Sequence, residues 1–216
     1  EKLVLVANQN GKKLARIHSD FKNATFSYNA AEDLDLKALE DAGHPDNAPI
    51  CPIIFTDGGK KAYITLRGGG LFIVDVSTTP MRAVKSYNKD EVAPAGCGGI
   101  ATGKKIYVNS GTATSSNLYV FDSSNDNLIK RIDLSGIGND GHGLVLTGKG
   151  RYLWMGNRAS GNIVVVDTKS DSIVGTISDV GKAPDIMDIS PDGERVFVAL
   201  RGPNNLTGGA VAKGER

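Results

Sequence analysis

Residues 142–178 read HGLVLTGKGRYLWMGNRASGNIVVVDTKSDSIVGTIS and hold four short apolar runs. The first run begins at His142, the second follows Arg151, the third closes at Asp167, and the fourth covers residues 172–177. Glycine, aspartate, asparagine and serine, which separate these runs, are typical of tight turns. The stretch therefore predicts four short antiparallel β-strands joined by tight turns.

The same pattern recurs about every 45 residues along the chain. The opening position of the pattern is occupied in turn by Cys51, Cys97, His142 and Asp185. The third run closes each time on an aspartate, at Asp75, Asp122 and Asp167. Four antiparallel strands per repeat of this length are typical of β-propeller blades, in which the first strand lines a central channel and the fourth lies at the rim.

We therefore expect an all-β chain that forms a single β-propeller domain over residues 1–216. The expected blades cover residues 1–29, 51–88, 97–134, 142–178 and 185–216, so that about five blades are visible. The first lacks its inner strand and the last breaks off after its second strand, so closing strands are expected beyond the C-terminal end. Residues 30–50 form an insertion, either a short helix capped by Asn29 or an extended loop.

The composition excludes several classes of protein. The chain has 216 residues, of which 27 are glycines, and such an excess fits many tight turns. Its net charge of +1 gives no electrostatic basis for binding nucleic acid. No apolar run approaches the roughly 18 residues that a membrane-spanning helix needs, so membrane insertion is not expected.

Two segments carry a family resemblance. Residues 105–109 (KIYVN) with residues 117–122 (NLYVFD), and residues 190–199 (SPDGERVFVA), resemble YVTN-type β-propeller repeats. The resemblance covers roughly residues 1–29 and 51–202. Proteins of this family are bacterial and archaeal secreted, periplasmic or surface-layer proteins, so the resemblance implies an extracellular, periplasmic or cell-surface location. No catalytic motif of the family's enzymatic relatives can be placed on residues of this chain.

The opening positions form a candidate site, because inner strands converge on the axis of a propeller. Cys51, Cys97, His142 and Asp185 would then meet at one mouth of the channel. Thiolate, imidazole and carboxylate groups are ligands for zinc or copper, so Cys51, Cys97 and His142 are candidate metal ligands. Two other interpretations stay open, a Cys51–Cys97 disulfide and a pair of free buried thiols.

Two further sets of residues recur with the repeat. The closing aspartates are expected to accept hydrogen bonds from the turn that follows each third strand, and His18 is placed at the corresponding position of the first repeat. Arg67, Arg158 and Arg201 follow the second strands. They either form an anion-binding set on one face or are ordinary solvated arginines.

These observations leave three hypotheses for function, because a propeller hosts many activities. The first is a non-enzymatic secreted or cell-surface binding or scaffold module, with a protein partner or self-assembly. The second is an enzymatic or redox propeller with a metal or unknown cofactor at the channel mouth. The third is a lactonase-like hydrolase, for which the chain offers no recognisable set of catalytic residues.

Overall fold

The computed structural model describes residues 2–94 and 96–202, and for residue 2 and residues 51–55 it describes the backbone only. The chain divides into two compact units, Glu1–Pro94 (unit 1) and Ala95–Arg216 (unit 2). Each unit is described by itself below. The end of the fifth predicted blade, residues 203–216, lies outside the described residues.

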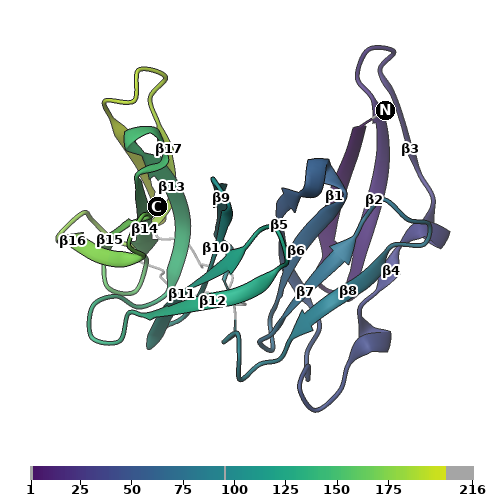
Figure 1. Ribbon diagram of the computed structural model, residues 1–216, viewed down its shortest axis with the longest axis horizontal. Helices are drawn as coiled ribbons and strands as arrows, with labels where there is room; N and C mark the ends of the chain where they lie inside the picture. The colour runs from purple at the N-terminus through teal and green to yellow at the C-terminus, as the bar shows by residue number, and fades with distance from the viewer. Residues whose placement is uncertain (1, 95, 203–216) are drawn as a thin grey trace. The chain divides into compact units, whose positions relative to one another are not determined.

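Unit 1 contains two antiparallel sheets (Figure 1). In the first sheet the order is β1-β2-β3, and β4 pairs with β2 beside β3. Its strands are β1 (Lys2–Asn8), β2 (Lys13–Asp20), β3 (Thr25–Tyr28) and β4 (Leu34–Asp35). The second sheet has the consecutive order β5 (Pro49–Thr56), β6 (Lys61–Leu66), β7 (Leu71–Asp75) and β8 (Arg82–Tyr87), with the short η3 (Asp57–Gly59) between β5 and β6.

In residues 96–202, the part of unit 2 that the structure describes, there are two four-stranded sheets and one strand pair. The first sheet runs in consecutive order through β9 (Gly99–Thr102), β10 (Lys105–Thr112), β11 (Ser115–Asp122) and β12 (Asn127–Asp133). The second runs through β13 (Gly141–Thr147), η4 (Gly148–Gly150), β14 (Tyr152–Asn157), β15 (Asn162–Asp167) and β16 (Ser172–Ile177). Strand β17 (Pro184–Ile189) pairs with β18 (Val196–Leu200). The prediction of an all-β chain built from four-stranded antiparallel sheets is confirmed.

The insertion forms two single turns of 3-10 helix around a short strand. Asn29 caps η1 (Ala30–Glu32), because its side chain accepts a hydrogen bond of 3.1 Å from the Ala31 amide. Strand β4 and η2 (Lys37–Leu39) follow. Leu36, between β4 and η2, is fully buried in the core of unit 1. Tertiary burial of this leucine decides the path of the insertion, which is why a single helix does not form.

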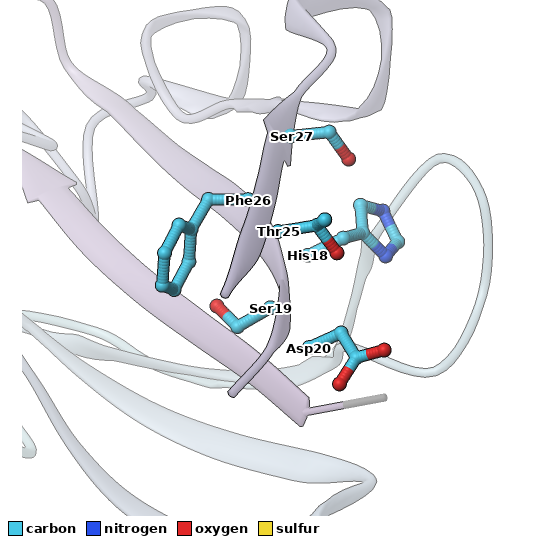
Figure 2. Close-up of a pocket in the computed structure, with 6 residues that line it drawn as sticks. All are labelled: His18, Ser19, Asp20, Thr25, Phe26 and Ser27. Atoms are coloured by element: carbon cyan, nitrogen blue, oxygen red, sulfur yellow. The ribbon is translucent and has the colours of Figure 1, made fainter. Parts of the chain in front are cut away.

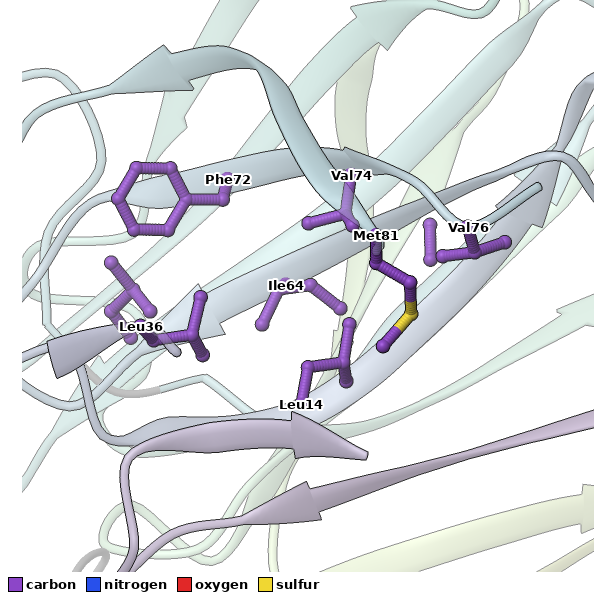
Figure 3. Close-up of a cluster of buried hydrophobic side chains, with 9 residues drawn as sticks. Leu14, Leu36, Ile64, Phe72, Val74, Val76 and Met81 are labelled. Atoms are coloured by element: carbon purple, nitrogen blue, oxygen red, sulfur yellow. The ribbon is translucent and has the colours of Figure 1, made fainter. Parts of the chain in front are cut away.

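Each unit has its own hydrophobic core. In unit 1 the side chains come from β2, the insertion, β6, β7 and the segment before β8, and Figure 3 shows them gathered around Ile64. They are Leu14, Leu36, Ala62, Ile64, Leu66, Phe72, Val74, Val76 and Met81. In unit 2 one cluster joins side chains of β10–β12 with those of β14 and β15, among them Leu118, Leu153 and Val164. Burying a side chain of this size stabilises the fold by about 1.5–3 kcal/mol.

Within the described part of the chain, the structure contains no helix with the length and apolar character needed to cross a membrane.

Candidate functional site

The opening positions of the repeats lie at or near the start of the first strands. Cys97 precedes β9, His142 is the second residue of β13, and Asp185 is the second residue of β17. Cys51 lies in β5, and its side chain is outside the described residues. Because the Cys51 side chain is not described, the pairing of Cys51 with Cys97 stays a prediction.

His142 and Asp185 meet in unit 2. Nδ1 of His142 lies 2.5 Å from Oδ1 of Asp185, and both side chains are mostly buried, with 16 % and 17 % of their surface exposed. Burial by itself raises the pKa of Asp185. The contact with the His142 imidazole, together with the charges of Arg158 and Arg201, outweighs that effect, and the pKa lies below its usual value. The carboxylate of Asp185 is therefore held in its ionised form beside the imidazole.

A buried ion pair lies beside this contact. Arg158 donates from Nε and Nη2 to the two oxygens of Asp140, at 3.1 and 3.2 Å. The side chain of Asp140 is fully buried and that of Arg158 is 2 % exposed. Burial raises the pKa of the Asp140 carboxyl, and the Arg158 guanidinium opposes that rise. Nη1 of Arg158 also lies 3.7 Å from Oδ1 of Asp185, so the two charged pairs are neighbours.

These contacts change the interpretation of the predicted anion-binding arginines. Arg158 is not solvated, because it is buried against Asp140. Arg201 is exposed, and its charge acts on Asp185. Arg67 belongs to unit 1, where its Nε lies 3.8 Å from Asp46. Each arginine therefore acts on a carboxylate of the chain itself, which weakens the attraction for an external anion.

Backbone packing between first strands sets the geometry of the site. A Cβ atom on Gly98 would lie 2.0 Å from the carbonyl oxygen of His142, and one on Gly143 would lie 2.0 Å from that of Asp185. At such distances no side chain fits unless the strands move apart. The fully buried Asn109 completes the junction, because its Nδ2 donates to the His142 carbonyl at 2.5 Å and its Oδ1 accepts from the Gly98 amide at 2.9 Å.

The closing aspartates have the structural role predicted for them. Oδ1 of Asp75, Asp122 and Asp167 accepts a hydrogen bond from the backbone amide two residues later, at 3.0, 2.8 and 2.7 Å. In the first repeat the equivalent residue is Asp20, which ends β2 and accepts from the Lys22 amide at 3.0 Å. The prediction that His18 occupies this position is wrong, because β2 extends two residues further than its apolar pattern indicated.

His18 instead belongs to a polar cluster in unit 1 that the sequence did not reveal. Its Nε2 lies 2.7 Å from Oε2 of Glu32, and the same carboxylate oxygen accepts from Nε of the buried Arg16 at 3.0 Å. Hydrogen bonds from His18 and Arg16 lower the pKa of Glu32. His18 also lines a pocket of about 290 Å³ between β2 and β3 (Figure 2). Glu32 comes from the insertion, outside the repeat, so no repeat position could indicate this cluster.

A shallow depression of about 200 Å³ lies next to Arg158 in unit 2. Its lining is mainly small residues and backbone, with one exposed lysine, and consists of Arg158, Ala159, Ser160, Gly161, Gly181, Lys182, Ala183 and Gly202. Among the residues that the structure describes, no three histidine, cysteine or acidic side chains are grouped as metal ligands would be. The proposed metal ligands Cys51, Cys97 and His142 are not tested by this, because the Cys51 side chain is not described.

Comparison with known proteins identifies the architecture. The model of the YNCE-like beta-propeller family matches residues 55–214, well over half of the chain. Among solved structures, the chain is similar to the hydrazine synthase of Kuenenia stuttgartiensis, with a TM-score of 0.54 and 13 % identity over 92 % of this chain and 77 % of that chain. Identity at this level shows a shared fold alone. No match is found among curated protein sequences. The β-propeller predicted from the repeats is confirmed.

Proposed function

The chain belongs to the YNCE-like β-propeller family, and we propose that it is a non-enzymatic binding module. Its binding surface is the part of unit 2 formed by His142, Asp185, Lys182, Arg201 and the adjoining depression. The bound species is a protein partner. The fold by itself decides nothing here, since propellers support many functions, so the proposal depends on the chemistry of this surface.

One observation carries the proposal, namely that four ionisable groups at or directly beneath this surface are paired with one another. Arg158 is neutralised by the buried Asp140, and His142 is held against Asp185. Groups fixed in this way cannot move far or take up a substrate charge, but they present a preorganised polar surface. The adjoining depression offers glycine backbone and the Ser160 hydroxyl as hydrogen-bonding groups. Such a surface suits recognition of a polar protein surface.

We place this module outside the cytoplasm, at the cell surface or in secreted form. The support is the resemblance of residues 105–109 and 190–199 to YVTN-type repeats, and a Cys51–Cys97 disulfide, one of the three interpretations of these cysteines, would agree with this location. Mass spectrometry of unreduced proteolytic peptides, with cell fractionation, tests both points. A cytoplasmic protein with two alkylatable thiols contradicts this location.

The binding role is tested with charge reversal. Immobilised protein is incubated with an envelope extract of the source organism, and the partner that it retains is purified and titrated by calorimetry. We expect Lys182→Glu and Arg201→Glu each to weaken this binding about tenfold or more, a loss typical of a favourable interfacial contact. Lys149→Glu is the matched control, because Lys149 is an exposed lysine in η4, beyond the other end of the strand that holds His142. Equal effects of all three variants, or no retained partner, contradict the proposal.

The second candidate function is catalytic, and the His142–Asp185 contact favours it. An imidazole held by a carboxylate is the arrangement used in general acid–base catalysis. A redox or metal-dependent enzyme would use Cys51, Cys97 and His142 instead, and a lactonase-like hydrolase is a third form. Elemental analysis and an absorption spectrum of native protein, with a lactone hydrolysis assay of wild type and His142→Asn, separate these forms. Bound metal, a chromophore, or turnover that His142→Asn abolishes replaces the binding proposal.

A further inference from the structure

The outer strands β8, β12 and β16 share a structural feature that their sequences do not indicate. In β8, β12 and β16 the register with the neighbouring strand shifts by one residue, so that the third residue of each strand is left without a partner. These residues are Val84, Ile129 and Val174, which are 45 %, 51 % and 55 % exposed. A β-bulge bends an edge strand and disrupts its row of hydrogen-bonding groups, which blocks pairing with another chain.

Strand β3, the outer strand beside β2, has no such protection. Its four residues Thr25–Tyr28 pair with Ile17–Asp20 in unbroken register. It contains no charged residue, whereas β8 and β12 also carry lysine and arginine. All four of its residues are exposed, and within the described residues its only strand partner is β2. An unbroken, uncharged edge is the kind that pairs with a further strand.

The side chains of β3 divide between the two faces of the sheet. Figure 2 shows Thr25 and Ser27 on the same side as His18 and Asp20, and Phe26 on the opposite side. Alternation along the strand places Tyr28 on the Phe26 side. Phe26 is 61 % and Tyr28 is 56 % exposed. The ring of Phe21, 60 % exposed, meets that of Phe26 edge to face at 5.9 Å. One face is thus polar and the other carries three exposed aromatic rings.

We propose that β3 pairs antiparallel with β3 of a second copy of this chain, forming an edge-to-edge dimer. The strand is self-complementary in one register. With Ser27 of each copy on the two-fold axis, Phe26 of one copy lies opposite Tyr28 of the other, twice, on the same face. Aromatic pairs directly opposite each other favour such sheets, and no like charges face each other within the strand. A two-fold interface of this kind closes on itself and does not grow into a filament.

The proposal names a second copy of the chain as the partner for the self-assembly expected of a scaffold module. It uses residues of unit 1, whereas the proposed binding surface consists of residues of unit 2. Three paired strand residues per copy make a small interface, so we expect a reversible dimer that forms as the concentration rises. A monomeric protein that still binds its partner through Lys182 and Arg201 would overturn the dimer and leave the proposed function standing.

Cysteine substitution tests the register. In the full chain, Ser27→Cys places two thiols opposite each other on the axis, within reach of a disulfide. We expect most of this variant to become a disulfide-linked dimer under mild oxidation, seen on a non-reducing gel. Thr25→Cys is the matched control, since it lies on the same strand and face but is roughly 13 Å from its copy, at about 3.4 Å per residue. Equal cross-linking of both variants, or none with Ser27→Cys, overturns the proposal.

Charge substitution tests the edge in solution. Sedimentation equilibrium of wild-type protein should give a dimer whose dissociation constant rises at least about tenfold in Phe26→Lys. Val84→Lys, on the bulged outer strand of the same unit, should leave the dimer unchanged. A wild-type protein that stays monomeric up to several hundred micromolar contradicts the proposal, as does a dimer that Val84→Lys disrupts equally.

Discussion

At the scale of single residues, the opening position of the repeat works together with the residue that follows it. Gly98 follows Cys97 and Gly143 follows His142, and each glycine lies against the carbonyl oxygen of the next opening residue. Neither glycine has a positive φ. Glycine is needed at these positions because the backbones of successive first strands approach each other closely. The missing Cβ atom leaves room for the carbonyl group of the next opening residue, and this close packing positions that residue.

Gly143→Ala tests this packing. A Cβ at 2.0 Å from a backbone oxygen forces the strands apart, and overpacking of this kind costs about 1–3 kcal/mol. Gly175→Ala is the control, because a Cβ atom at that position would meet nothing within 4 Å and alanine is favoured over glycine within a strand. Urea unfolding should show a clearly lower free energy of unfolding for Gly143→Ala than for wild type, and no decrease for Gly175→Ala. A stability for Gly143→Ala equal to that of wild type would refute the close approach.

Arg158→Met tests the buried ion pair. Removing the guanidinium leaves the Asp140 carboxylate buried without its Arg158 partner, and breaking a buried ion pair in this way costs about 3–5 kcal/mol. The double variant Arg158→Met/Asp140→Asn should recover part of this loss, because asparagine is neutral and accepts the positive φ of 59° at position 140.

The same variant has a characteristic pH dependence. Burial raises the pKa of Asp140, so the folded state binds a proton more readily than the unfolded state does. Without Arg158 nothing from that guanidinium opposes the rise in the pKa of Asp140. The loss of unfolding free energy in Arg158→Met should therefore become smaller as the pH falls from 7 to 5, while the double variant shows no such recovery. Urea midpoints at the two pH values measure this, and a deficit independent of pH contradicts it.

At the scale of strands and turns, the aspartate that closes each third strand fixes the hairpin to the outer strand. In Asp122 one carboxylate oxygen accepts from both the amide and the hydroxyl of Ser124, at 2.8 and 2.6 Å. Asp75 does the same with Ser77. The turn chemistry is local, which is why the repeat pattern was sufficient to predict it.

Asp122→Ala tests this turn. Losing the two hydrogen bonds that Ser124 donates should lower the free energy of unfolding and the urea midpoint. Asp122→Asn keeps an acceptor oxygen and should retain most of that stability. The two variants are compared by urea unfolding at pH 7. If Asp122→Asn is as unstable as Asp122→Ala, the charge and not the turn geometry determines the effect.

The strands were largely predictable from the sequence, and the departures have identifiable causes. The four runs of residues 142–178 are found as β13–β16, because alternating apolar runs and turn residues act locally. The insertion was not predictable, since the burial of Leu36 and the pairing of β4 with β2 are tertiary effects. The bulges at Val84, Ile129 and Val174 were not predictable either, because a register shift depends on the neighbouring strand.

At the scale of the whole molecule, the repeat placed His142 and Asp185 at equivalent positions but did not predict which charged groups pair with each other. The meeting of His142 with Asp185 follows from equivalent positions in successive repeats. The burial of Arg158 against Asp140 does not, because nothing in the repeat distinguishes it from the exposed Arg201. The sequence repeat therefore predicts which residues are at equivalent positions. It does not predict which charged residues pair, because that depends on how deeply each one is buried.

The acid stability of the molecule follows from its turn aspartates taken together. Six of them have a lowered pKa, chiefly because a neighbouring side chain donates a hydrogen bond to the ionised form: Asp20, Asp75, Asp122, Asp133, Asp167 and Asp192. A folded pKa below the ordinary value of 3.8 means that the unfolded state binds protons first as the pH falls. Each group therefore stabilises the fold fully above that value and loses its contribution as the pH falls through the folded pKa.

We accordingly expect urea midpoints to stay level from pH 7 to about 5 and to fall steeply below about 4, where the unfolded-state carboxylates become protonated. Asp140 acts in the opposite sense, but it is one group against six. Net positive charge at low pH also destabilises a compact state, and salt screens that repulsion. Repeating the series in 0.05 and 0.5 M NaCl separates the two causes, because a hydrogen bond within one turn is insensitive to salt. A decline that disappears at high salt would assign acid unfolding to charge repulsion instead of the turn aspartates.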